Sequence, residues 1–131
     1  MNNVNSPPST PILRGPSRGT AGTIYNFSTY TIDQNNDLIF IWFDWGDDNS
    51  SGWLGPYNSA EECNAFHTWT SKGNYEIKVK AKDIYGAESG WSDPLPITMP
   101  YSYNKHIQPF LELLFQQFPH AFPVLKQIFG Y

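Results

Sequence analysis

The sequence is short of charged residues, and this shortage excludes several classes of protein. Charged residues make up only 15% of the 131 positions, whereas 40% are hydrophobic and 17% are aromatic. A chain with this balance folds by burying apolar surface and does not belong among intrinsically disordered proteins. The net charge of -4 argues against nucleic acid as a partner, because a phosphate backbone attracts dense Lys and Arg. No apolar run approaches the roughly 20 residues of a membrane helix, so we expect no membrane span.

Cysteine is nearly absent, and the sequence motifs of catalysis are missing. Cys63 is the only cysteine, and no activating residues surround it, so we interpret it as a small buried hydrophobe without a disulfide partner. No nucleophile-elbow, phosphate-loop or zinc-protease motif occurs. His67, His106 and His120 are not spaced as a local zinc site, and we expect His67 to bond backbone groups beside a turn. We therefore predict a protein that is not an enzyme.

What the sequence does contain is a series of short apolar runs separated by turn signals. Residues 1–11 are rich in Asn, Ser and Pro, which is the composition of a linker. Residues 12–100 hold six or seven predicted strands, of which residues 75–82 alternate most clearly between apolar and charged side chains. Pro94 and Pro96 predict that the last strand lies at a sheet edge. The pattern predicts an all-β Greek-key sandwich.

Residues 101–131 change character and predict a short apolar helical tail. Apolar residues recur at helical spacing after Pro109, which suits a first helical turn, and Pro119 ends the helix. This apolar stripe consists of Ile107, Phe110, Leu111, Leu114, Phe115 and Phe118. Such a segment needs a surface to cover.

The strand at residues 38–45 suggests such a surface. If the alternate residues from Ile39 to Trp45 face the core, Phe40 and Trp42 point outward. Two large apolar side chains on a wet face require a cover, and we predict that the tail supplies it. The tail either folds back on its own domain or packs on a neighbouring copy, which would make a homo-oligomer or a head-to-tail filament.

Three segments together resemble the PKD domain family. Residues 43–48 (FDWGDD) are similar to the family's W-D-F-G-D-G motif, residues 67–75 (HTWTSKGNY) to its H-x-Y-x-x-x-G-x-Y motif, and residues 79–83 (VKAKD) to V-x-V-x-D. The loop at residues 33–37 stands where the family commonly has D-P-D-G-D, and the resemblance spans about residues 11–99. It implies an immunoglobulin-like sandwich that serves as a spacer or adhesion module in archaeal and bacterial secreted or surface proteins.

The loop at residues 33–37 also suggests a calcium site. Asp33, Asn35 and Asp37 alternate and offer the hard oxygen ligands that calcium prefers. The alternative is a turn in which the same side chains accept backbone hydrogen bonds. Gln34, Asn35 and Asn36 replace the family's Pro, Asp and Gly, which weakens the transfer of a calcium loop.

The aromatic residues allow a second kind of site. Trp53, in the polar and turn-like block of residues 50–64, could form a sugar-stacking platform with Tyr57, whereas we expect Trp45 and Trp69 to fill the core.

Other polar residues have simpler interpretations. Asn26 and Asn49 fit the N-glycosylation sequon. We interpret Gly46 as a structural turn residue, and the stripe of Lys78, Lys80 and Lys82 as a solvated strand face that discourages edge pairing.

The function predicted from the sequence is that of a non-catalytic extracellular or cell-surface module. It would mediate structural or adhesive association between proteins, including self-assembly into surface filaments through the tail. The alternative function is a carbohydrate-binding accessory module of a secreted hydrolase.

Overall fold

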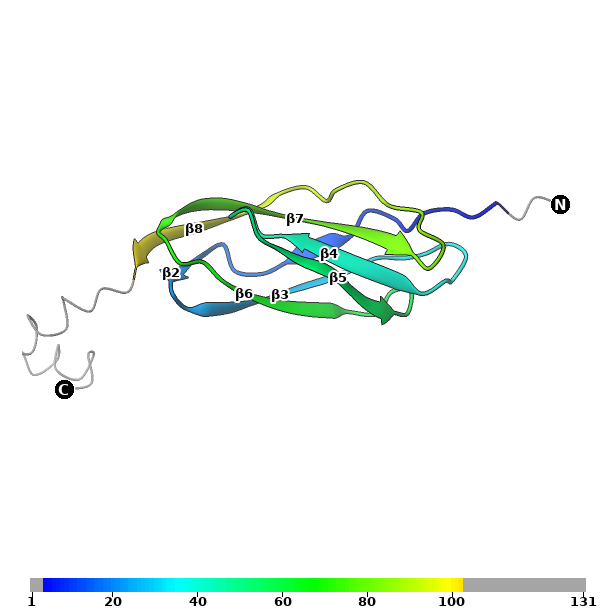
Figure 1. The fold of residues 1–131 in the computed structure, drawn as a ribbon, viewed down its shortest axis with the longest axis horizontal. Helices are drawn as coiled ribbons and strands as arrows, with labels where there is room; N and C mark the ends of the chain where they lie inside the picture. Colours follow the sequence, from blue (N-terminus) through cyan, green and yellow to red (C-terminus); the bar gives the residue numbers. More distant parts are fainter. Residues whose placement is uncertain (1–3, 103–131) are drawn as a thin grey trace, which may run out of the picture.

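The computed structural model describes residues 4–102, which form two β-sheets packed face to face (Figure 1). One sheet has three strands in the order β1-β3-β6, and the other has five in the order β2-β8-β7-β4-β5. Among the described residues there is no helix, so the predicted all-β sandwich is confirmed, while the predicted helical tail lies outside them. The strands are β1 (Ile12–Arg14), β2 (Arg18–Ala21), β3 (Ile24–Tyr30), β4 (Ile39–Asp44), β5 (Ser50–Tyr57), β6 (Cys63–Thr68), β7 (Gly73–Asp83) and β8 (Leu95–Ser102).

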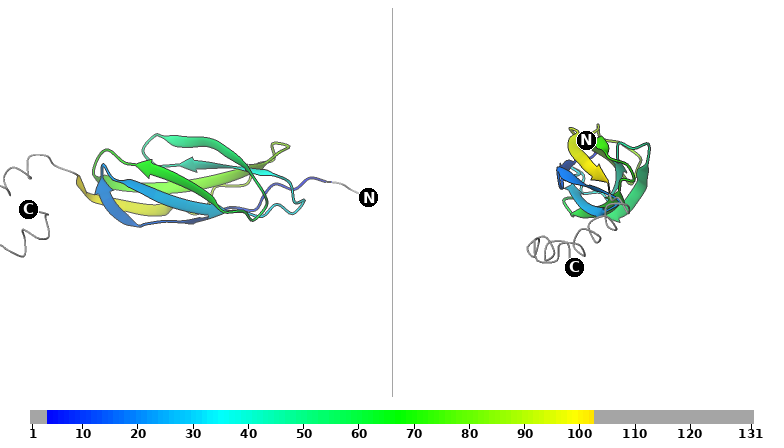
Figure 2. Two further views of the ribbon diagram at one scale, coloured as in Figure 1. Left: turned by 90° about the horizontal axis from the view of Figure 1, so that it is seen from below. Right: turned by 90° about the vertical axis from the view of Figure 1, so that its left-hand side faces the viewer.

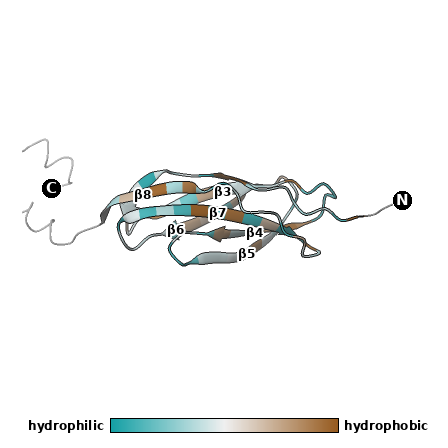
Figure 3. Cartoon of the chain, turned by 90° about the horizontal axis from the view of Figure 1, so that it is seen from above, coloured by the Kyte–Doolittle hydropathy of each residue, from teal (hydrophilic) through white to brown (hydrophobic). Residues whose placement is uncertain are grey.

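Alternation along β4 and β7 places the core between the sheets. Ile41 pairs with Ala81 and Phe43 with Val79, and all four side chains are fully buried. The intervening residues of both strands point to the outer face, so hydrophobic and hydrophilic positions follow one another along β7 (Figure 3). Because β4 and β7 are adjacent inner strands of the five-stranded sheet, their shared register fixes both faces of that sheet.

An aromatic cluster joins the two sheets at one end of this core. The Phe27 ring lies 5.7 Å from the rings of both Trp45 and Trp69. The Trp69 indole Nε1–H donates to the Trp45 carbonyl oxygen at 3.1 Å, which satisfies the one polar atom of that buried side chain. Trp69 is fully buried and Trp45 is 2% exposed, which confirms both as core residues, and Cys63 is buried as expected.

Two strands of the five-stranded sheet, β5 and β2, were not predicted from the sequence. The block at residues 50–64 was expected to be turn-like, yet residues 50–57 form β5. Gly52, Gly55 and Pro56 are typical turn residues, which is why the sequence predicted a turn. An outermost strand tolerates them because it pairs on one side only, and β5 pairs with β4 with shifts in register. The short strand β2 was not predicted at all.

The positions of β7 and β8 in the sheet also differ from those that the sequence predicted. β8 was expected at an edge, but β2 pairs with it in parallel from Thr98 onward. Pro96 precedes the residues that pair with β2. At Pro96 only β7 flanks the strand, so the N–H that proline lacks is not needed for hydrogen bonds to a second strand. Along Lys78 to Lys82, β7 pairs with β4 on one side, and residues 87–92 hydrogen-bond to its other edge, so the lysines do not stand on an open sheet edge.

The described chain enters at one end of an elongated sandwich and leaves at the other (Figures 1 and 2). Residues 5–11, predicted as linker, lie against the domain: Ser9 N–H donates to the Ile32 carbonyl oxygen at 2.9 Å, and Pro8 and Pro11 are buried. β8 continues to Ser102, two residues beyond the predicted end of the sandwich.

Gly46 allows a direct test of the turn that ends β4. Its φ is +79°, and a Cβ there would lie 2.5 Å from the Glu76 carbonyl oxygen, whereas Gly52 has φ +67° with open space around it. Both Ala variants meet the left-handed penalty of roughly 1–2 kcal/mol, but only Gly46→Ala also meets a backbone clash. We expect urea denaturation to show Gly52→Ala destabilised by about 1 kcal/mol and Gly46→Ala by about 3 kcal/mol or more. Equal losses would contradict this role of Gly46.

Candidate functional site

The outer face of the five-stranded sheet carries aromatic rings interleaved with lysines. The register sets Phe40 beside Lys82 and Trp42 beside Lys80, and Trp53 of β5 lies on the other side of Trp42. The Trp42 and Trp53 rings meet edge to face at 5.3 Å. We call this surface the aromatic–lysine face, and it consists of Phe40, Trp42, Trp53, Lys78, Lys80, Lys82 and Trp91.

Each lysine of this face lies over at least one ring. Lys82 Nζ is 4.5 Å from the Trp53 ring centre, and Lys80 Nζ is 4.9 Å from the Trp91 ring centre. A cation over an aromatic face is attracted by the ring quadrupole, and its alkyl stem covers apolar surface. Phe40 and Trp42 are consequently half-buried within their own sheet, and the tail residues predicted to cover them lie outside the described residues.

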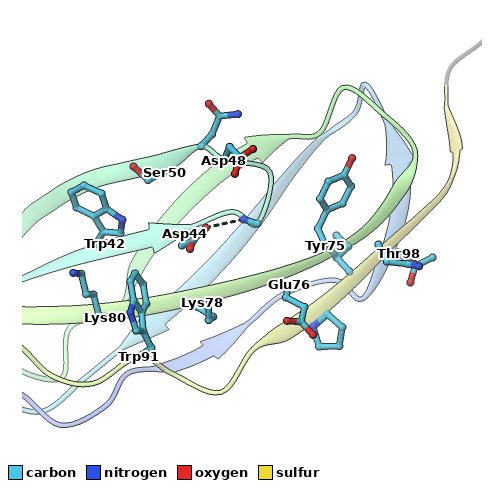
Figure 4. A pocket seen from close by; sticks show the side chains of 15 residues that line it. Trp42, Asp44, Asp48, Ser50, Tyr75, Glu76, Lys78, Lys80, Trp91 and Thr98 are labelled. Atoms are coloured by element: carbon cyan, nitrogen blue, oxygen red, sulfur yellow. Dashed lines mark hydrogen bonds between the residues drawn. The ribbon is translucent and has the colours of Figure 1, made fainter.

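A wide groove of about 900 Å³ runs along this face (Figure 4). Lys80 projects between Trp42 and Trp91, and the carboxylates of Asp44 and Glu76 lie further along the groove (Figure 4). Lys80 Nζ also pairs with the Glu88 carboxylate at 3.0 Å. The groove therefore offers aromatic surface with charges of both signs, which suits a polypeptide better than a polyanion.

Trp53 and Tyr57, the predicted sugar platform, are not brought together on one face. Trp53 packs outward on Trp42, whereas Tyr57 pairs with the core residue Ile39 and packs against the core. A hydrogen bond with Cys63, together with burial and the charge of Glu61, raises the pKa of Tyr57 to about 12. Trp91 is 42% exposed, and it is the aromatic residue of the groove that sequence reasoning did not single out.

A second candidate site lies at the end of the domain where the N-terminal segment packs. Asp33, Asp37 and Asp83 each place a carboxylate oxygen within 4.8 Å of the others. Asp33 and Asp83 are 3% and 1% exposed. Asp33 Oδ1 accepts the amide N–H of Asn35 at 2.9 Å, as the turn interpretation expected. Its buried Oδ2 has no hydrogen-bond partner among residues 4–102.

Asp83 belongs to this acidic trio in place of Asn35. The Asn35 amide oxygen instead accepts the Ser6 N–H at 2.8 Å and helps to hold the N-terminal segment. Asn5 completes that attachment by donating to Asp83 Oδ2 at 2.6 Å. The sequence contained a signal for Asp83. In the alternation along β7, Asp83 falls on the same inward face as Ile77 and Val79, so its carboxylate had to be buried.

The electrostatics of the trio favour a cation. Burial, followed by the charges of Asp33 and Asp83, raises the pKa of Asp37. Burial also acts to raise the pKa of Asp83, but hydrogen bonds from Asn5 and from nearby backbone amides outweigh it and lower that pKa. Clustered carboxylates with one unsatisfied oxygen match the hard-oxygen preference of calcium, so these residues fit the predicted ion.

His67 and the sequon asparagines have simple surroundings. His67 Nε2 lies 2.7 Å from Asp47 Oδ2, and its ring stacks on Trp45 at 4.7 Å, so it bonds a carboxylate and not the backbone groups expected. Asn26 and Asn49 are both exposed, and the Asn26 amide donates to Asn64 at 3.3 Å.

Comparison with solved structures identifies the family. This chain is similar to the PKD domain of an M14-like peptidase from Thermoplasmatales archaeon SCGC AB-540-F20, with 45% identity and a TM-score of 0.71. The match covers 74% of this chain and 99% of that one. The chain therefore belongs to the PKD domain family, which confirms the resemblance seen in its motifs. No family model matches the sequence, and no curated protein matches it. Among residues 4–102 no helix is long and apolar enough to cross a membrane.

The cover that lysines give to the rings can be measured by a double-mutant cycle. We expect Lys82→Ala and Trp53→Ala to be coupled by about 0.5–1 kcal/mol in the free energy of unfolding, because the ammonium group loses its ring. The same cycle with Lys72→Ala, in the exposed turn before β7, serves as control and should give no coupling. A zero value for the Lys82 cycle would mean that the contact has no energetic weight.

Proposed function

We propose that this PKD domain is a non-catalytic extracellular accessory module that binds proteins, carried beside the catalytic domain of a peptidase. The observation that supports it most is the aromatic–lysine face with its groove. Tryptophans at the centre of a surface, flanked by both signs of charge, are typical of protein-binding hot spots. The peptidase context comes from the relative, whose name places its PKD domain in an M14-like peptidase.

Two features favour a protein ligand over the alternative, a carbohydrate. A sugar platform needs bare ring faces, but lysine ammonium groups lie over the rings of Trp42, Trp53 and Trp91. Trp53 and Tyr57 also belong to opposite faces of the sheet. A polypeptide offers carboxylates for the lysines as well as apolar side chains for the rings, so it satisfies both kinds of group.

The elongated shape supports an additional spacer role. The described chain enters and leaves at opposite ends, so the sandwich would hold flanking segments apart (Figure 1). The family relationship does not support self-assembly into filaments.

Binding to an extended protein tests the proposed function. We expect unfolded casein to change the tryptophan emission of the full chain without being cleaved. Trp91→Ala should weaken the apparent affinity at least about tenfold, as loss of a hot-spot aromatic does. Tyr85→Ala, an exposed aromatic outside the groove, is the matched control and should bind normally. A response to soluble glycans with none to casein would overturn the proposal in favour of the carbohydrate-binding alternative.

We also propose that the acidic trio binds calcium and so attaches the N-terminal segment more firmly. The buried Asp33 oxygen without a partner supports this, because an unpaired buried carboxylate oxygen is costly until a cation satisfies it. Asn5 and Ser6 already contact Asp83 and Asn35, so an ion there would reinforce the same junction.

Thermal unfolding tests the calcium proposal. Calcium at 100 times its Kd should add about 2.7 kcal/mol to the free energy of unfolding and raise Tm, and a chelator should reverse the change. Asp83→Asn should remove the calcium response, because the amide keeps an acceptor for the turn amides but loses the charge. Asp93→Asn, an exposed carboxylate outside the trio, should keep it. An identical Tm with calcium and with chelator would exclude a site coupled to folding.

A further inference from the structure

The outer face of the three-stranded sheet carries a patch that no described residue covers. Ile24 is 65% exposed and Phe66 is 62% exposed. Ile24 pairs with Thr68, and Phe66 pairs with Asn26, so the two apolar side chains are diagonal neighbours on one face. In contrast to the aromatic–lysine face, no lysine of residues 4–102 lies over the Phe66 ring.

The same face continues as a shallow hollow toward the other end of β3. Ile12 is 47% exposed and pairs with Tyr30. Together with Arg14 these residues line a depression of about 310 Å³. A continuous face therefore runs along β3 from Ile24 to Tyr30, with apolar residues at both ends.

The chain leaves the described domain next to this face. Ser102, at the end of β8, pairs with Ala21, and the Gly22 N–H donates to the Trp69 carbonyl oxygen at 2.7 Å. Ile24 begins β3 just after this turn. The following residues thus start at the edge of the patch, while Phe40 and Trp42 lie on the outer face of the opposite sheet.

The length of the tail's apolar stripe matches the length of the face. The seven residues of β3 span about 20 Å at a rise of roughly 3.4 Å per residue. A helix over residues 107–118 would span about 17 Å at roughly 1.5 Å per residue. Residues 103–106 are enough to turn the chain from β8 onto the sheet.

We propose that the apolar stripe of the tail docks on the Ile24–Phe66 face of its own domain. This choice replaces Phe40 and Trp42 as the surface under the tail, because lysines and Trp53 already cover those rings. It also leaves the aromatic–lysine face open to a partner. The inference is independent of the proposed function, since it uses the other sheet.

Disulfide trapping in the full chain tests which face the tail covers. Phe66→Cys is combined in turn with Phe110→Cys, Leu111→Cys and Leu114→Cys. In the control set, Trp42→Cys is combined with the same three tail substitutions. Cys63 is fully buried and stays in place. We expect at least one Phe66 pair to form a disulfide within the monomer and no Trp42 pair to do so. Trapping from Trp42, trapping only as a dimer, or no trapping in either set would overturn the proposal.

Hydrogen exchange gives a second readout that does not depend on new cysteines. Amides of residues 107–118 should exchange more slowly than unprotected peptide in the native chain. Phe66→Glu should speed their exchange at least about tenfold, which is a loss of about 1.4 kcal/mol of protection. Tyr85→Glu, which adds the same charge at a site 74% exposed on another part of the domain, should leave it unchanged. Equal exchange in all three proteins would refute docking on this face.

Discussion

The pairing of β4 with β7 is the constraint on which the rest of this domain depends. Both strands alternate strictly, and their register sets Phe43 opposite Val79 on the inside and Trp42 opposite Lys80 on the outside. A slip of one residue would turn the whole apolar set of either strand to water. Because the inner residues are fully buried, the hydrophobic effect that stabilises the core also determines which aromatic and basic side chains meet on the outer face.

This constraint links the stability of the core to the proposed binding surface. The outer residues of β4 and β7 are free to carry binding chemistry, since the core depends only on the alternate positions. Rings and lysines are compatible on this face, because each ammonium group lies over a ring and a lysine stem can cover apolar surface. A partner that supplies carboxylates and apolar groups can replace water at such a face. The two ends of the sandwich then serve different purposes, with the acidic trio holding the N-terminal segment at one end and the chain leaving at the other (Figure 1).

Much of the fold followed from the sequence because its signals were local. The alternation at residues 75–82 and 38–45 predicted β7 and β4, and the motifs around Trp45 and Trp69 indicated the family and the core. Features that depend on long-range pairing were missed or misplaced. β5 resembles a turn in its composition, because an outermost strand can accommodate glycine and proline. Trp53 was consequently placed in a loop, and its contact with Trp42 could not be foreseen.

The candidate sites show the same division. Asp33 and Asp37 lie in one loop and were predicted together. Asp83 comes from a strand distant in the sequence, and only the alternation along that strand indicated that its side chain is buried. The lysines were interpreted as a solvated face because a sequence does not reveal which rings lie across the ladder. The fold class can thus be predicted from the periodicity of the sequence. A site assembled from several strands can be predicted only when the register between those strands is known.

The proposed binding surface can be tested by the response of the five tryptophan indole N–H signals to a protein ligand in solution. With unfolded casein as the probe, we expect the signals of Trp42, Trp53 and Trp91 to shift, because these rings belong to the aromatic–lysine face. The signals of Trp45 and Trp69 should stay in place, since both rings are buried between the sheets. Shifts confined to other parts of the domain, with the three outer indoles unmoved, would contradict the assignment of this face as the binding surface.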